Sequence, residues 1–439
     1  MPTLSPLSAS TPPSLKKWVK ILRAGVCGCL FLLVSVPGPV LALSPYAFQG
    51  HVSRRVLSNY LARAITMSNM LDEMDLYLTE HIRMVTHLGA KFLGRTALIW
   101  GNEGVFPARV ADLPAKAWQV HAADPEVLLE AGIFEFVSSD VELVPIPSWV
   151  FEWLGAPVQT RNFDYESMLF TCQSPVIDGY PENASVPDVS RTETQMWIFY
   201  QAASYIDAGI EALHLGQLEW MCGCDPGFVQ LEYLATLIRT YAARHARRGL
   251  VLLNAHSHGI VREGKLLLDF CEYPLRVKEA AGSQTNEGVL EMGFLDSIYG
   301  LTKGGLTPGG WYVEHALYLV EFDHGYAGLT PGTCTKPECV WGYDEITWFA
   351  RLGLEERNAF IEYAWRWVRS RDPYGFVEMP GMRDIQGLAG NNADWYYANS
   401  PSSHPYGFDQ EETIRRIWRS RPPVSDPTAG LRVLLLQGF

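Results

Sequence analysis

The sequence predicts an α/β fold, a (β/α)8 TIM-type barrel with an N-terminal helical extension. Seven or eight apolar, strand-like segments alternate with helical segments over roughly 340 residues. The strands are almost continuously apolar, as expected for parallel strands that are buried on both faces. No glycine-rich phosphate loop follows the first strand, which argues against an open sheet that binds a dinucleotide. We expect the barrel over residues 96–439 and the helical extension over 43–95.

Residues 1–42 have the pattern of a secretory signal peptide. Four basic residues precede a mostly apolar run over 26–36, and Val40 and Ala42 supply the small-residue pattern of a cleavage site. The alternative is an uncleaved anchor, but about 11 apolar residues are few for a membrane span. We therefore expect a secreted or periplasmic protein with no membrane segment after cleavage.

The charge of the chain limits its partners. The formal net charge is −13, and it becomes −17 when the four basic residues of the signal are removed. Nucleic acids and anionic membrane surfaces repel such a protein, so we expect neither as a partner. Neutral or cationic substrates remain open, and the oligomeric state cannot be predicted.

The cysteines suggest disulfides rather than a metal site. Six cysteines follow the signal: Cys172, Cys222, Cys224, Cys271, Cys334 and Cys339. Cys334 and Cys339 bracket a short loop that can close on itself in an oxidising compartment. Cys222 and Cys224 are too close for an easy mutual bridge, so each should find another partner or stay reduced. No cysteine spacing resembles a zinc finger, and we expect no cofactor.

The first elements are expected between residues 53 and 137. The pattern over 53–91 is helical and rich in Leu, Met and Ala, and it leads into an apolar strand at 96–100. A second strand is expected at 133–137. A proline-containing irregular stretch then extends from 144 to 187.

A βαβ unit follows this stretch. Thr192 and Gln195 form a potential capping box for a helix that ends at residue 207. A strand is expected at 211–217, and a helix with its apolar face between residues 231 and 245 connects it to a strand at 250–256.

The remaining elements are two strands, a helix and a last strand. The strands are expected at 266–270 and 318–323, the helix at 355–369 and the last strand near 376–378. Only about nine residues separate the strands at 256 and 266, too few for a helical crossover, so we expect a hairpin or an irregular turn there.

Polar residues collect where the apolar strands end. They are Glu103, Gln217, Glu219, Asn254, His256, His258, Asp269, Glu272, Glu321, Asp323 and Glu378. In a barrel of this type the active site lies at the carboxyl ends of the strands. Strand alternation places Glu321 and Asp323 on one face, which we expect to point into the barrel. Any single strand-end acid can instead cap a helix or pair with an arginine, but several converging acids indicate an enzyme.

In this layout the chain resembles secreted (β/α)8-barrel glycoside hydrolases, although it matches no particular family's motif. The resemblance implies a carbohydrate substrate and a pair of carboxylates at the barrel mouth. Glu219 is the candidate general acid and Asp323 the candidate nucleophile or base. Glu321 takes the place of Asp323 if the catalytic position lies one pleat earlier.

Other polar and aromatic residues are candidate substrate ligands. They are Gln217, Asn254, His256, His258, Asp269, Trp341, Asp344 and Glu345. Asp269 could bind sugar hydroxyls or tune the pKa of a neighbour. Trp341 lies beside the two acids before a possible helix, whereas we assign Trp348 to the core. Residues 391–397 repeat this mixture of acids, amides and aromatics.

Two other functions remain open. His256 and His258 could bind a divalent metal in a metal-dependent hydrolase. The preferred hypothesis, a glycoside hydrolase with two carboxylates, includes no metal. A non-catalytic carbohydrate-binding barrel would keep the aromatic residues and tolerate the loss of either acid. A serine hydrolase has little support, because no Gly-x-Ser-x-Gly motif is present.

Overall fold

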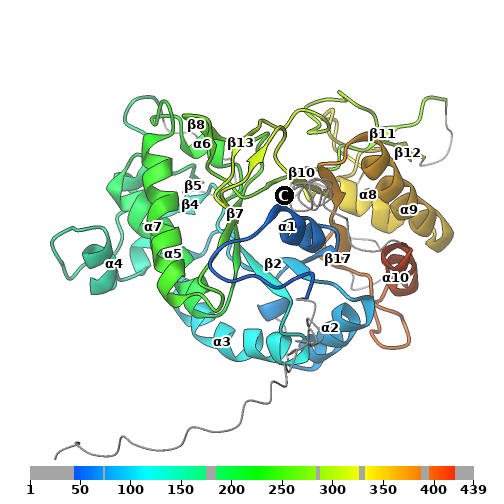
Figure 1. Cartoon of the computed structure of the whole chain (residues 1–439), viewed down its shortest axis with the longest axis horizontal. Coiled ribbons are helices and arrows are strands. Elements are labelled where there is room, and N and C mark those ends of the chain that lie inside the picture. Colours follow the sequence, from blue (N-terminus) through cyan, green and yellow to red (C-terminus); the bar gives the residue numbers. More distant parts are fainter. Residues whose placement is uncertain are drawn as a thin grey trace, which may run out of the picture. The chain divides into compact units, whose positions relative to one another are not determined.

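Parallel strands alternate with helices in a mixed α/β architecture (Figure 1). The computed structural model describes residues 44–72, 75–174, 184–282, 287–325, 332–386 and 395–420. The expected signal peptide and residues 391–394 lie outside these ranges. The described residues belong to one compact unit that begins at Ser44.

The larger sheet has seven strands among the described residues. In spatial order they are β18 (Trp395–Tyr397), β17 (Met379–Asp384), β1 (Ala64–Met67), β2 (Phe92–Leu98), β3 (Leu128–Gly132), β6 (Ala212–His214) and β7 (Leu252–Asn254). Neighbouring strands are parallel, except that β18 pairs antiparallel with β17.

A smaller parallel sheet has the order β10 (Cys271–Pro274), β15 (Tyr318–Glu321) and β16 (Gly375–Val377). Two contacts relate it to the larger sheet. A parallel bridge joins Glu272 in β10 to His256, just after β7. On the other side, Glu378 alone separates β16 from β17, and its backbone N–H donates to the carbonyl of Val320.

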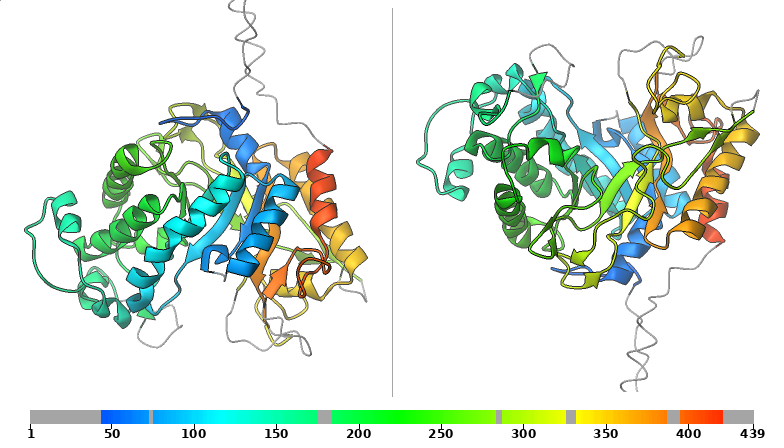
Figure 2. Two further views of the ribbon diagram at one scale, coloured as in Figure 1. Left: turned by 90° about the horizontal axis from the view of Figure 1, so that it is seen from below. Right: turned by 90° about the horizontal axis from the view of Figure 1, so that it is seen from above.

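Helices flank the strands (Figure 2). The longer ones are α1 (Arg54–Leu61), α2 (Asp75–Leu88), α3 (Phe106–Ala123), α5 (Thr192–Asp207), α7 (Val229–His245), α8 (Glu345–Arg351), α9 (Leu354–Arg371) and α10 (Glu411–Arg419). Two short helices are α4 (Ser148–Trp153) and α6 (Leu218–Met221). Short 3-10 helices are η1 (Met70–Asp72), η2 (Glu103–Val105), η3 (Ser139–Leu143) and η4 (Glu166–Met168).

The connections contain short antiparallel pairs. They are β4 (Val137–Ser138) with β5 (Ala184–Ser185), β8 (Val261–Arg262) with β9 (Lys265–Leu266), β11 (Lys278–Glu279) with β12 (Gly288–Val289), and β13 (Gly305–Leu306) with β14 (Tyr312–Val313). The pair β8–β9 confirms the hairpin expected between the strands at 256 and 266.

The N-terminal segment departs from the prediction. We expected only helices over 43–95, but β1 lies between α1 and α2 and pairs with both β2 and β17. The segment is therefore part of the main sheet. β1 has only four residues, too few for the alternation that distinguishes a strand from a buried helix.

Several helix boundaries agree with the prediction, although one expected cap does not form. α5 spans residues 192–207 as expected. Its N-cap is Arg191, without a side-chain cap, and Gln195 instead donates to the carbonyl of Val189. α7 and α9 cover the expected segments with small shifts at their ends.

An apolar cluster packs α1 against the beginnings of the strands. It joins Val56, Leu57 and Tyr60 of α1 to residues such as Phe92 and Leu128, which begin β2 and β3. In Figure 1, α1 lies over the strands. The amino ends of the strands are thus covered, which leaves the carboxyl ends for polar side chains.

The cysteines form two disulfides among the described residues. Cys334 bonds to Cys339, as expected, and Cys224 bonds to Cys172. Cys222 is a buried free thiol, so Cys222 and Cys224 do not bond to each other, as expected. Within the same residues, none of the helices combines the length and apolarity needed to cross a membrane.

Candidate functional site

Two layers of buried side chains cross the strands. The apolar layer contains Phe92, Leu128, Ala212, Leu252, Phe270, Leu319 and Phe376. Two residues further along each segment lie Gly94, Glu130, His214, Asn254, Glu272, Glu321 and Glu378, all of them buried. Because strand side chains alternate, residues two apart share a face. The second set, which we call the charged layer, therefore lies one pleat closer to the carboxyl ends.

Arg95 enters the charged layer through an irregularity in β2. The register of β2 against β3 shifts between Leu93 and Ala97, and Arg95 has a φ of 57°. Such a bulge re-aims a side chain out of the regular alternation. The guanidinium is buried and forms an ion pair with Glu321. It also lies 3.3 Å from Glu272 Oε1 and 3.1 Å from His256 Nε2.

Hydrogen bonds and a close contact between His214 and Glu272 connect the other side of the layer. His214 Nδ1 lies 2.7 Å from Asn254 Oδ1 and 3.2 Å from Glu272 Oε2. Asn254 Nδ2 donates to Glu130 Oε1 over 2.5 Å, which fixes its Oδ1 as the acceptor for His214. Glu130 Oε2 accepts the backbone N–H of Arg95 over 3.1 Å. The network thus runs from β3 through β6 and β7 to β10.

The pKa is lowered for some glutamates of the layer and raised for others. Burial opposes the ionisation of Glu272, but the nearby His214 and Arg95 hold the pKa of its carboxyl below the ordinary value. Burial is likewise outweighed at Glu321, where Arg95 and Arg383 lower the pKa. Burial and the charge of Glu272 raise the pKa of Glu130. Two ionised glutamates therefore face two buried arginines, Arg95 and Arg383.

Glu378 is the least satisfied member of the layer. Both of its carboxyl oxygens are buried, and neither has a hydrogen-bond partner within the part of the chain that the structure describes. Burial, followed by the charges of Glu272, Glu321 and Glu130, raises its pKa well above the ordinary value. Gly94 supplies the space, because a Cβ atom there would lie 2.0 Å from Glu378 Oε1. A neutral carboxylic acid fits this position.

Asp323 and Glu321, two of the candidate catalytic residues, belong to this region. Glu321 is fully buried, whereas the side chain of Asp323 is 24% exposed. Arg383 Nη2 lies 3.7 Å from Glu321 Oε2 and also 3.7 Å from Asp323 Oδ1. The arginine thereby joins a buried carboxylate to an accessible one.

Glu219, the third candidate, lies in α6 just after β6 and is exposed. Its Oε1 accepts the hydroxyl of Ser257 over 2.6 Å, and this hydroxyl in turn accepts the N–H of Gly259. Ser257 follows β7, so the next strand helps to orient Glu219. Gln217 is partly buried, and its N–H donates to Glu135 Oε2.

The structure separates the candidate ligands of the middle strands. Asn254 and His256 lie in the network, and His256 Nε2 is 2.9 Å from Glu321 Oε1. His258 lies outside it, 3.0 Å from the carbonyl of Asp296. Asp269 precedes β10 instead of ending a strand, and it accepts bonds from Arg239 and from the N–H of Leu253. Its predicted place at a strand end is therefore wrong, because the hairpin β8–β9 delays the strand.

Glu345 and Asp344 begin α8 beside Asp323. Asp344 caps the helix by accepting the N–H of Thr347 over 2.7 Å, and burial raises its pKa to about 6. Glu345 is buried and accepts the N–H of Val277 over 2.8 Å and that of Asp323 over 3.3 Å. Burial raises the pKa of Glu345 to about 7, against the opposing effect of Arg276. Glu345 therefore holds the backbone of Asp323, whereas Asp344 fixes the first turn of the helix.

The two tryptophans near α8 differ in exposure. Trp341 is partly buried, and its backbone N–H donates to Glu279 Oε1 over 2.7 Å. Its ring stacks on Trp348 at 6.4 Å. Trp348 is buried in the core, as expected.

Sequence reasoning missed the centre of the network. Arg95, Glu130, His214 and Arg383 were not among the candidates, and Glu272 and Glu378 were noted only as strand-end residues. A detectable signal existed for Glu130, a single acid within the apolar stretch Leu128–Gly132. For Arg95 the signal was hidden, because a regular strand would turn its side chain to the other face.

Two groups of side chains have metal-ligand character among the described residues. Donor atoms of His214, His256 and Glu272 lie within 4.8 Å of one another, as do those of Glu272, Glu321 and Glu378. The guanidinium of Arg95 already contacts both groups and would repel a cation. His258 belongs to neither group.

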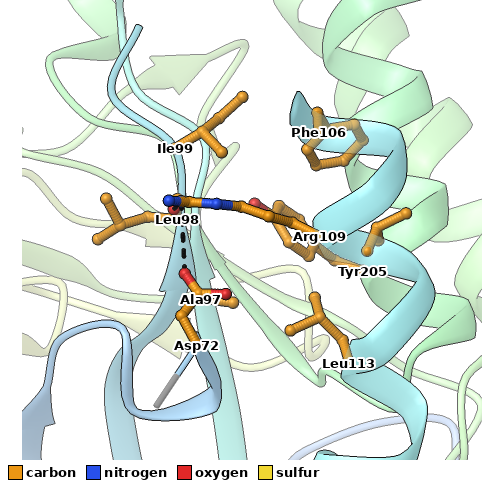
Figure 3. A pocket seen from close by; sticks show the side chains of 9 residues that line it. Asp72, Ala97, Leu98, Ile99, Phe106, Arg109, Leu113 and Tyr205 are labelled. Carbon is orange, nitrogen blue, oxygen red and sulfur yellow. Dashed lines mark hydrogen bonds and ion pairs between the residues drawn. The ribbon is translucent and has the colours of Figure 1, made fainter. Parts of the chain in front are cut away.

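A small cavity lies between β2 and α3 (Figure 3). Its walls are mostly apolar, and Arg109 crosses it to donate to the carbonyl of Leu98 and to pair with Asp72 over 3.4 Å. The charged layer contributes no residue to its lining. The cavity is therefore separate from the candidate site.

Comparisons with known proteins leave the family open. No protein-family model matches the sequence. No curated protein matches it. The comparisons assign no family.

Solved structures give weak matches. A maltogenic α-amylase, AmyB from Thermotoga neapolitana, matches with a TM-score of 0.30 and 10% identity over 48% of this chain and 47% of the amylase. A debranching enzyme from Nostoc punctiforme matches with a TM-score of 0.30 and 12% identity over 52% of this chain and 53% of its own. A variant of the glycoside hydrolase domain of PelA from Pseudomonas aeruginosa matches with a TM-score of 0.32 and 10% identity over 72% of this chain and 93% of its own.

The matches span about half the length of the amylase and of the debranching enzyme. TM-scores of 0.30 to 0.32 are too low to support an argument about this chain.

Proposed function

We propose that the chain is a hydrolase that cleaves glycosidic bonds, with Asp323 as the carboxylate that attacks the sugar or activates water. The observation that carries the proposal is the position of Arg383, 3.7 Å from both the buried Glu321 and the accessible Asp323. A catalytic carboxylate must meet the substrate and be held in place. Two observations support Asp323 in this role: its side chain is partly exposed, and Glu345 also accepts its backbone N–H.

Glu219 is the proposed proton donor. It is exposed, it follows a different strand from Asp323, and Ser257 orients its carboxyl group. The proton would pass from Glu219 to the leaving oxygen while Asp323 bonds to the anomeric carbon or removes a proton from water. The fully buried Glu321 is then a positioning residue, because it cannot touch a substrate in this arrangement.

The proposal includes a closed (β/α)8 barrel in a secreted protein. The bridge between His256 and Glu272 and the near-continuous run of β16 into β17 support closure of eight parallel strands into a ring. Two disulfides support an oxidising compartment, in line with the signal expected at residues 1–42. A glycan is the proposed partner.

Reducing-sugar release from a panel of polysaccharides tests the proposal. We expect release by the wild-type protein and a loss on the order of 10²- to 10⁴-fold in Asp323→Asn. Asp112→Asn is the matched control, because Asp112 is an exposed carboxylate of α3. Asp323→Asn activity equal to that of the control would remove Asp323 from the mechanism.

A metal-dependent hydrolase is the second candidate, favoured by the grouping of His214, His256 and Glu272 within 4.8 Å. The same panel run with a chelator separates the two. Release that disappears on chelation and returns with added metal would support the metal site, whereas release that ignores the chelator supports the two carboxylates. If the panel is silent but a glycan still binds, a carbohydrate-binding barrel replaces both.

A further inference from the structure

Five aromatic rings form an arc along the carboxyl ends of neighbouring strands. Trp100, Phe134, His214, His256 and Tyr273 lie in or just after β2, β3, β6, β7 and β10, in that order. Successive ring centroids are 5.1, 5.6, 4.8 and 6.1 Å apart. The arc therefore connects Trp100 to the histidine that contacts Glu321.

Trp100 is the outermost ring and is held firmly. The residue is 41% exposed, yet its ring stacks on Phe136 with centroids 5.4 Å apart and an interplanar angle of 9°. Phe136 is buried, and the edge contact with Phe134 fixes the ring from a second side. A large ring fixed in this way presents a flat apolar face to solvent without the entropy loss that a mobile side chain would suffer on binding.

Polar groups border the arc. Behind Phe134, the buried guanidinium of Arg95 lies 5.5 Å from the ring centroid, and the ring of His214 is buried as well, so a ligand can reach only the other four rings. At the far end, the hydroxyl of Tyr273 donates to Asp296 over 2.8 Å. The accessible part of the arc thus offers the aromatic faces of Trp100 and Phe134 at one end and the polar groups of His256 and Tyr273 at the other. Such a combination matches the surface of a sugar ring, which has C–H faces and a polar edge.

We propose that Trp100 forms a remote subsite, and that the substrate is a glycan chain of several sugar units lying over the accessible rings of the arc toward Asp323. The proposal rests on the proposed function and extends it, because a site for a single sugar would not need a fixed platform four rings away from Tyr273. Remote contacts of this kind position a substrate for the reacting groups.

Binding to oligosaccharides of different lengths tests the subsite. The parent protein is the full chain with Asp323→Asn, which prevents turnover, and the probes are cello-, malto- and chito-oligosaccharides of two and six units. Titration calorimetry should show that adding Trp100→Ala weakens binding of a hexasaccharide roughly tenfold and leaves binding of the disaccharide unchanged. Trp100→Phe should retain part of the affinity, because it keeps a flat ring.

Trp118→Ala in the same parent is the matched control, since Trp118 lies on α3 and is 68% exposed. Equal hexasaccharide affinities of the Trp100 and Trp118 variants would overturn the inference. So would an equal loss for both probe lengths, or the absence of binding by the parent. Length-dependent loss at Trp100 in a protein that releases no sugar would instead overturn the proposed function alone.

Discussion

At the residue scale, the buried glutamates occupy two different electrostatic environments. Glu321 pairs with Arg95 and Arg383, and these charges lower its pKa. Glu378 has no such partner among the described residues, and burial raises its pKa. One carboxyl is therefore held as an anion and the other as a neutral acid, although both are fully buried and lie in the same layer.

Neutral replacement of each glutamate should reveal this difference. Glu321→Gln leaves the buried Arg95 without its closest anion and should lower the free energy of unfolding by about 3–5 kcal/mol. Glu378→Gln replaces a neutral acid by a neutral amide of the same shape and should cost less than about 1 kcal/mol. Urea unfolding at neutral pH measures both changes. Equal losses in the two variants would show that Glu378 is also ionised.

The sequence allowed some of these residues to be predicted, and the structure explains the rest. Asn254, His256 and Glu321 could be found, because each continues an apolar strand in its regular alternation. Asp269 was placed at a strand end by the same reasoning, which failed because a hairpin shifts the start of β10. Arg95 depends on a bulge, a feature that the alternation of side chains does not reveal.

At the element scale, the Cys172–Cys224 disulfide connects distant parts of the chain near the candidate site. It joins residues 52 apart and holds the segment after η4 against the loop that follows α6, the helix that carries Glu219. Cys334 and Cys339 are only five residues apart. The first bond therefore restricts the unfolded chain more than the second.

Loss of the longer-range disulfide should be the more costly. From the loss of loop-closure entropy, replacing Cys172 and Cys224 by serine should lower the free energy of unfolding by about 4 kcal/mol. The same change at Cys334 and Cys339 should lower it by about 2 kcal/mol. Guanidinium unfolding without reductant measures both. A larger loss at the short loop would mean that native contacts, and not chain entropy, dominate.

Elements differ in how far the sequence determines them. α5 and α7 are long enough for their periodicity to define them, and their observed bounds follow the apolar pattern. β1 and β3 were missed or displaced because four or five residues carry little periodicity, and their strand form depends on pairing with neighbours distant in sequence. Tertiary contacts decide such short strands.

At the scale of the whole molecule, the buried acids affect stability at different pH. Glu272 and Glu321 have lowered pKa values in the fold, so their stabilisation is present above the ordinary pKa near 4.5 and is lost as the pH falls. Glu345 has the opposite effect on the pH dependence of stability. Burial raises its pKa from 4.5 to about 7, so the folded state holds a proton that the unfolded chain releases above pH 4.5.

We therefore expect the stability of the protein to fall as the pH rises from about 4.5 to 7, with Glu345 contributing about 3 kcal/mol to the fall. Glu345→Gln should reduce this slope, because an amide does not titrate. At pH 4 the variant should be about 1 kcal/mol less stable than the wild type, since an amide nitrogen cannot accept the N–H of Asp323 or Val277. Above about pH 7 it should be the more stable of the two, because it escapes the larger ionisation penalty of Glu345.

Thermal unfolding of the wild type and of Glu345→Gln between pH 4 and 8 measures the slope. Glu232→Gln is the control, because Glu232 is a glutamate of α7 that pairs with Arg262 at the surface and should leave the slope unchanged. A wild-type slope retained in Glu345→Gln would assign the titration to another buried acid, with Asp344 next because burial raises its pKa to about 6. Because the penalty is complete once Glu345 has ionised in the folded protein, the fall in stability that Glu345 causes should level off above about pH 7.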